Sequence, residues 1–219
     1  MVSMPSFTPE PSRTRLDFFA PPHETQMTSL TPWLVAFLMA KAPHLTEARS
    51  WRIAQDIEQV VLSEQPLWDD PQGRARTALL LASVMWHESK FAIEVDEHTG
   101  RQRRRPYVCM MQVRVGRGRT QEGWTAQQLA EDRQKCLRAG LHIAQHSFRL
   151  CAGQPDHLRL AAYVSGSCRK GHPQSRVRIQ EVKRWWSLHQ PSFHDKALLE
   201  SASMAYTPTR HPGASLKVN

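Results

Sequence analysis

The stretch "LLASVMWHESKFAIEVD", residues 80–96, places an acid where a helix should be apolar. Its apolar residues recur at helical spacing, and Glu88 falls in the same stripe, between Val84 and Phe91. A carboxylic acid in apolar surroundings holds its proton more readily and can donate it to a substrate. The alternative is a helix-end glutamate that caps a neighbouring loop or pairs with one of the chain's many arginines. Periodicity alone does not decide between a catalytic acid and an ion pair.

The composition predicts a soluble globular protein. The chain has 219 residues and 40% apolar residues, which is enough for a packed core. Its longest apolar run, residues 33–40, is too short for a membrane span, which needs about 20 apolar residues. This run also lacks the preceding basic region of a signal peptide. We therefore expect neither a membrane span nor a cleaved export signal.

The net charge of +9 is concentrated after residue 75. Residues 1–75 hold six Lys/Arg and nine Asp/Glu, which leaves 23 basic and 11 acidic residues in the remainder. The basic clusters "GRQRRRPY" (100–107), "RVGRGR" (114–119) and "CRKGHPQSRVR" (168–178) favour a polyanionic partner, either nucleic acid, lipopolysaccharide or an anionic cell wall. A solubilising basic face is the alternative.

The pattern along the chain predicts an all-α fold. We expect helices over about 32–41, from about Thr46, through the Glu88 stretch, from Thr125 to Cys151, after Asp156, and in "PQSRVRIQEVKRWW". Thr125 and Gln128 fit a capping box, and Asp156 is the expected cap of its helix. Residues 94–122 form an arginine-rich excursion without a helical period. No alternating pattern is long enough for a main sheet.

Three segments are expected. Five prolines precede residue 23, so residues 1–30 should form an extended arm. Residues 31–190 should form one helical domain, and residues 191–219 a tail.

Two other kinds of site are excluded by spacing. "HESKF" (87–91) begins like the zinc motif H-E-x-x-H, but Phe91 stands where the second histidine should be. His87 and Ser89 lie two residues apart on a helix and have no G-x-S-x-G elbow, so they do not form a nucleophile and its base. No metal and no cofactor are expected.

Three segments occur in an order that resembles the catalytic domain of soluble lytic transglycosylases, relatives of goose-type lysozyme. They are "HESKF" (87–91), "YVCMMQV" (107–113) and "LAAYVSG" (160–166), and the resemblance covers roughly residues 74–187. In that family an E-S pair ends a helix, a G-L-M-Q segment follows, and an A-Y-N-x-G segment comes after another long helix. The resemblance implies a lysozyme-like helical fold.

The resemblance assigns roles to five positions. Glu88 matches the catalytic acid/base, and Ser89 matches its helix-end partner near the saccharide. Met111 and Gln112 match the Met-Gln pair that lines the glycan cleft, and Tyr163 matches the tyrosine beside the acid.

This chain departs from the family at two places. Cys109 and Met110 stand where the family has Gly and Leu. Val164 and Ser165 replace the Asn and the small residue after the tyrosine. Loss of the Asn removes a polar group from the cleft, so substrate preference or efficiency should differ.

The resemblance implies cleavage of the β-1,4 bond between N-acetylmuramic acid and N-acetylglucosamine in peptidoglycan, with a 1,6-anhydro product. Ordinary glycosidases need two carboxylates. Glu94, Asp96 and Glu97 are near enough in sequence to supply a second acid, but their spacing selects none of them. A lysozyme-type muramidase, which is a hydrolase, is therefore the first alternative.

The second alternative is a non-catalytic polyanion-binding, DNA-binding or structural virion protein. A helix-turn-helix reader needs an exposed recognition helix, and the nearest candidate, "SRVRIQEVKRWW" (175–186), carries two tryptophans that resemble core anchors. Nucleic acid is therefore not the expected partner. A wall-degrading protein without a signal peptide should reach its substrate in the periplasm on a phage particle, through a secretion machine or at lysis, and a phage virion or lysis protein is the favoured expectation. Other virion or secretion-machine proteins would then contact the N-terminal arm.

The four cysteines allow one favoured pairing. Cys136 and Cys151 lie roughly 22 Å apart along one expected helix, so they cannot bond to each other. Bonding of Cys151 to Cys168 is favoured, which leaves Cys109 with Cys136 as a second bridge. Four reduced thiols remain the alternative, as expected for a protein made in the cytoplasm.

Overall fold

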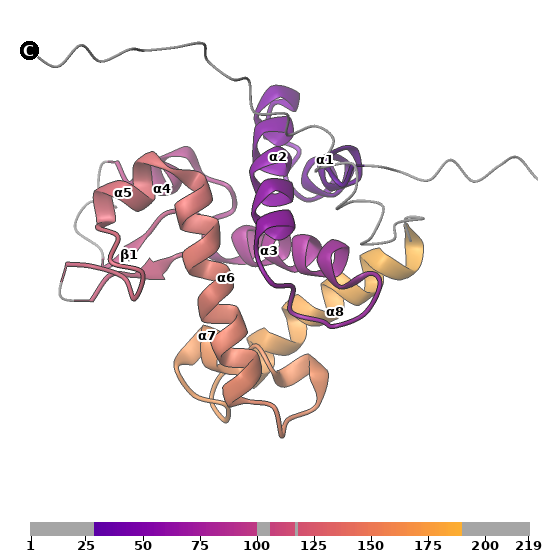
Figure 1. Cartoon of the computed structure of the whole chain (residues 1–219). Helices are drawn as coiled ribbons and strands as arrows, with labels where there is room; N and C mark the ends of the chain where they lie inside the picture. The colour runs from indigo at the N-terminus through magenta and orange to yellow at the C-terminus, as the bar shows by residue number, and fades with distance from the viewer. Residues whose placement is uncertain (1–28, 100–105, 117, 190–219) are drawn as a thin grey trace, which may run out of the picture.

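The computed structural model describes residues 29–99, 106–116 and 118–189, and helices make up most of these residues (Figure 1). The order is α1 (Thr31–Lys41), α2 (Glu47–Ser63), α3 (Gly73–Ser89), α4 (Ile93–Asp96), β1 (Tyr107–Val108), β2 (Val113–Arg114), α5 (Ala126–Glu131), α6 (Arg133–Leu150), the 3-10 helix η2 (Asp156–Leu158), α7 (Ala161–Ser165) and α8 (His172–Leu188). The described residues are mainly helical, with one two-stranded hairpin, which confirms the expected all-α class. Residues 1–28 of the expected arm, the expected tail, and Arg103–Arg105 within the first arginine cluster lie outside the described residues.

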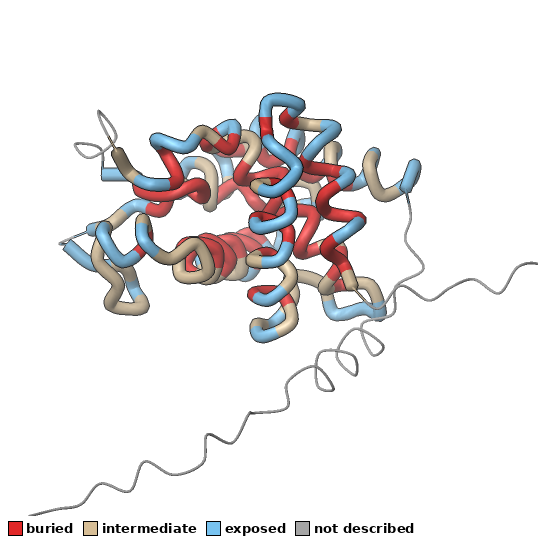
Figure 2. The backbone as a smooth tube through the Cα atoms, turned by 90° about the horizontal axis from the view of Figure 1, so that it is seen from above, coloured by how far each residue is buried: buried red, intermediate tan, exposed pale blue. Residues whose placement is uncertain are grey.

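Helix α3 is the most deeply buried element. Twelve of its residues are buried, and it packs against α1, α2, α6 and α8. Figure 2 shows the buried segments gathered in the middle of the molecule and the exposed ones around them. A helix that is apolar on nearly every side is typical of a core position. The single apolar stripe expected from the sequence was therefore too narrow for this helix.

The helix starts show where sequence signals hold and where they fail. Thr46 accepts a hydrogen bond from the backbone of Arg49 and caps α2. Thr125 and Gln128 form the complete capping box of α5. Helix α1 differs, because Thr31 is already helical and its backbone N–H donates to Glu58 of α2 over 3.1 Å. A neighbouring helix thus supplies the cap of α1.

The helical region after Thr125 is interrupted. Asp132 has extended backbone angles, φ −131° and ψ 100°, which separate α5 from α6. Its side chain accepts from the backbone N–H of Lys135 and caps α6. The predicted cap at Asp156 is wrong: Asp156 is the first residue of η2 and lies 3.5 Å from Arg159 in an ion pair.

Helix α8 is held against α1 by aromatic contacts. Trp185 meets the ring of Phe37 edge-on at a centroid distance of 5.2 Å, and Trp186 meets Trp33 at 5.7 Å. These contacts confirm that the two tryptophans are anchors.

The hairpin and two disulfides complete the fold around α6. Strands β1 and β2 are antiparallel, with Tyr107 opposite Arg114. Cys109, in the hairpin turn, is bonded to Cys136 of α6, and Cys151 at the end of α6 is bonded to Cys168. Both predicted pairings are confirmed, and no cysteine is free. In Figure 1, the hairpin, α4 and α5 lie at one end of α6, and α7 lies at the other.

No helix among the described residues is long and apolar enough to cross a lipid bilayer.

Candidate functional site

Glu88 lies in the last turn of α3, where the helix stops abruptly. Lys90 and Phe91 both take left-handed backbone conformations, with φ of 53° and 56°. The Ser89 hydroxyl donates to the carbonyl of Met85 over 2.8 Å and accepts from the N–H of Phe91 over 3.2 Å, so it holds this turn. Phe91 is buried through the turn and not as part of the helix, which ends earlier than the periodicity indicated.

An arginine from α8 contacts the Glu88 carboxylate. Arg178 Nη2 donates to Glu88 Oε1 over 2.6 Å, and the two side chains are 7% and 22% exposed. The ion-pair alternative raised by the sequence is therefore present in the structure. Among the described residues, no hydrogen bond reaches the other carboxylate oxygen, Oε2. This oxygen remains accessible to a molecule in the adjoining cleft.

The turn between β1 and β2 carries the second motif. Cys109 and Gln112 are left-handed, with φ of 59° and 49°. The carbonyl of Cys109 accepts from the backbone N–H of Gln112 over 2.9 Å and from its side-chain amide over 3.1 Å. The disulfide to Cys136 fixes the same turn to α6. The turn therefore sets the direction of the Gln112 side chain.

The third motif meets the second through Tyr163 in α7. Its hydroxyl donates to the carbonyl of Met111 over 2.7 Å, and its backbone N–H donates to Ser147 of α6. Burial raises the pKa of the Tyr163 phenol, and the negative charge of Glu88 raises it further. The phenol therefore stays protonated and remains a hydrogen-bond donor.

One cleft of about 520 Å³ brings three of the five candidate residues together: Glu88, Gln112 and Tyr163. Ser89 and Met111 are buried and do not line it. They act on the cleft through their neighbours, Ser89 by holding the end of α3 and Met111 by accepting from Tyr163. The rest of the lining is Tyr107, Arg114, Ile143, Ala162, Val164, Ser165 and Gly166.

Glu88 is the only carboxylate among the described residues that line this cleft. Of the three acids that could have supplied a second one, Asp96 is buried and paired with Arg49 and Arg133. Glu94 and Glu97 are exposed and belong to other surfaces.

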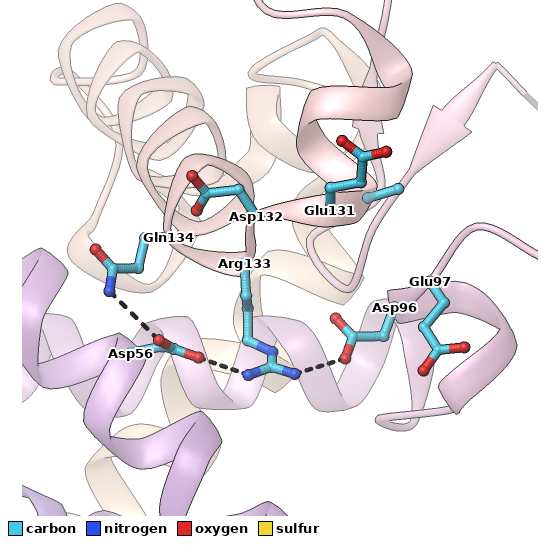
Figure 3. Close-up of a pocket in the computed structure, with 8 residues that line it drawn as sticks. Asp56, Asp96, Glu97, Glu131, Asp132, Arg133 and Gln134 are labelled. Carbon is cyan, nitrogen blue, oxygen red and sulfur yellow. Dashed lines mark hydrogen bonds and ion pairs between the residues drawn. The ribbon is translucent and has the colours of Figure 1, made fainter.

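A second cleft, of about 400 Å³, is lined by five acids: Asp56, Asp96, Glu97, Glu131 and Asp132 (Figure 3). Arg133 extends between Asp56 of α2 and Asp96 of α4, with contacts of 2.5 and 2.8 Å, and Gln134 also reaches Asp56. Burial lowers the pKa of Arg133, but the hydrogen bonds to Asp96 and Asp56 outweigh it and raise the pKa. The contacts of Arg133 therefore link α6 to α2 and α4. No cluster of three or more His, Cys, Asp or Glu suited to a metal ion occurs in the described part of the chain.

Sequence reasoning did not identify Arg178, Tyr107 or Arg114 as site residues. Arg178 lies 90 positions from Glu88, and local patterns do not pair residues at that separation. A basic cluster was visible around Arg114, but only the two-residue strands place that side chain in the cleft.

Comparison of the chain with protein-family models, curated proteins and solved structures finds no match. The likeness to lytic transglycosylases therefore rests on the three motifs and on the cleft that their residues share.

Proposed function

We propose that this protein is a peptidoglycan lytic transglycosylase with a lysozyme-like fold and that Glu88 is its catalytic acid and base. The observation that carries the proposal is the shared cleft. Glu88, Gln112 and Tyr163 come from three motifs far apart in sequence, and all three line one cleft. Motif order alone could arise by chance, whereas a common surface is what a glycan-cleaving site requires.

The geometry around Glu88 leaves one carboxylate oxygen, Oε2, to meet a glycosidic oxygen in the cleft. Arg178 occupies Oε1, and a guanidinium can donate to this oxygen whether the carboxyl group is ionised or neutral. The proton would therefore reside on Oε2 and pass to the oxygen of the leaving sugar as the C1–O bond breaks. The C6 hydroxyl of the muramoyl residue would then attack C1 and return its proton to Glu88. The 1,6-anhydro ring forms without consuming water.

The single carboxylate of the cleft supports this reaction over hydrolysis. An inverting hydrolase needs a second carboxylate to activate water, and a retaining one needs a carboxylate nucleophile. Glu88 is the only acid among the described lining residues, so an internal hydroxyl of the substrate is the simpler nucleophile.

The test uses purified sacculi and two matched variants. Glu88→Gln keeps the shape of the side chain but removes the proton donor, so wall clearing should fall by at least about 100-fold. Glu94→Gln, at an exposed position outside the cleft, should retain activity. Products of the unaltered protein should be one water lighter than lysozyme products by mass spectrometry and should resist borohydride reduction.

Three outcomes would contradict the proposal. Near-normal clearing by folded Glu88→Gln would remove Glu88 from the reaction. Products with a reducible end would identify a hydrolase. Retention of DNA by the unaltered protein, without any wall clearing, would favour the polyanion-binding alternative.

A further inference from the structure

The hairpin forms one wall of the Glu88 cleft with an aromatic ring and a cation. Tyr107 and Arg114 are partners across β1 and β2, and both line the cleft. Directly opposed side chains in an antiparallel pair lie on the same face of the sheet. Tyr107 is 45% exposed, although it is a large aromatic residue beside a concave surface. The pair therefore presents an apolar ring and a guanidinium side by side.

Arg114 differs from the other arginine beside the Glu88 cleft. Arg178 is buried and engaged by Glu88, whereas Arg114 is exposed and has no ion pair or side-chain hydrogen bond within the described residues. A guanidinium without an internal partner can form two parallel hydrogen bonds to a carboxylate. Because Glu88, the only acid that lines the cleft among the described residues, already has a cationic partner, the charge of Arg114 is available to a bound molecule.

We propose that Tyr107 and Arg114 form a subsite for an anionic sugar. The tyrosine face stacks against a saccharide ring, and the guanidinium pairs with a carboxylate attached to that ring or to its substituent. This inference rests on the proposed function, and it names the feature that separates the wall polymer from a neutral polymer such as chitin. In peptidoglycan the carboxylate comes from the peptide stem, or from the lactyl group of a muramic acid whose stem has been removed, because an attached stem forms an amide with the lactyl carboxyl group.

Binding measured without cleavage tests the subsite. All proteins carry Glu88→Gln, so that the ligand survives, and are mixed with intact sacculi, with glycan strands stripped of peptides, and with chitin. Adding Arg114→Gln should weaken binding to sacculi about 10-fold at low salt and leave chitin binding unchanged. Tyr107→Leu should weaken binding to all three ligands, because each of them contains the sugar backbone.

The matched control is Arg149→Gln, which removes an exposed arginine of α6 outside the cleft. It should leave binding to sacculi within about twofold, because a distant surface charge is screened by salt. Thermal unfolding of each variant checks that the fold is retained; Arg114 and Tyr107 are exposed, so neither change should lower stability.

The outcomes separate the carboxylate sources and the two proposals. An Arg114 effect that is larger on stripped strands, where the lactyl carboxylate is free, assigns that carboxylate, and one that disappears there assigns the peptide stem. An equal loss on chitin, an equal loss with Arg149→Gln, or no loss at all would overturn the subsite. If the unaltered protein fails to cleave sacculi but the Arg114-dependent preference holds, the enzyme proposal fails and the anionic subsite stands.

Discussion

Replacement of Gly140 by alanine should destabilise the protein, although alanine is the better helix former. Gly140 lies in the middle of α6 and faces Met111. A Cβ at this position would lie 2.5 Å from Met111 Cε, 2.8 Å from Cγ and 2.9 Å from Cβ. All three distances are shorter than normal van der Waals contacts. The Cε atom can rotate away, but the Met111 Cβ is fixed by its backbone.

The expected magnitude follows from two opposing effects. Alanine in a helix interior is favoured over glycine by about 1 kcal/mol. Overpacking of a filled core costs about 1–3 kcal/mol. Since Met111 lies in the turn held by the disulfide at Cys109, relaxation is restricted and the clash should prevail. We expect a net loss of up to about 2 kcal/mol in the free energy of unfolding.

Urea unfolding followed by tryptophan fluorescence measures the sign directly. The control Gly153→Ala places a Cβ in open space and should change stability by less than about 0.5 kcal/mol. Met111→Ala in the Gly140→Ala background removes two of the three close contacts, so the double-mutant cycle should show favourable coupling of about 1 kcal/mol. A Gly140→Ala protein that is more stable than the original, with no coupling to position 111, would refute this account of the packing.

Two further predictions concern covalent and electrostatic links. Removal of the Cys109–Cys136 bridge by serine substitution should lower the free energy of unfolding by about 3.5 kcal/mol and should lower wall-clearing activity in the protein that remains folded. Removal of the Cys151–Cys168 bridge should lower the free energy of unfolding by about 3 kcal/mol and spare the activity. Equal activity losses would argue against a role for the first bridge in the cleft. Burial raises the pKa of Glu181, but hydrogen bonds from neighbouring side chains outweigh this effect and lower the pKa to about 2. The ionised form of Glu181 therefore stabilises the fold above the ordinary glutamate pKa, and this contribution is lost as the pH falls toward 2. Glu181→Gln should therefore be less stable than the original protein at pH 6 and nearly as stable at pH 2.5 in urea unfolding, and a difference independent of pH would contradict this linkage.

The sequence predicted features that depend on near neighbours. The capping box of Thr125 and Gln128 is complete, because its two hydrogen bonds join residues three positions apart. The disulfide pairing could be worked out because one helix keeps Cys136 and Cys151 far apart. Grouping Glu88 with Gln112 and Tyr163 required the resemblance, since spacing alone relates none of them.

The features that sequence reasoning missed depend on distant parts of the chain. The cap of α1 comes from Glu58, on the next helix. The partner of Glu88 is Arg178, which belongs to the last helix and is buried there although arginine is usually exposed. The break at Asp132 was missed because its side chain can cap a helix while the apolar period continues on both sides.

The cysteine at position 109 shows how this chain accommodates its clearest departure from the family it resembles. The turn requires a left-handed residue there, with φ of 59°, and glycine adopts this conformation without cost. A residue with a Cβ is disfavoured in this region by about 1–2 kcal/mol. A bridge that closes a loop between Cys109 and Cys136 can contribute about 3.5 kcal/mol, which outweighs the backbone penalty. The departure therefore exchanges a flexible glycine for a covalent link to α6, and it keeps the carbonyl that accepts two hydrogen bonds from Gln112.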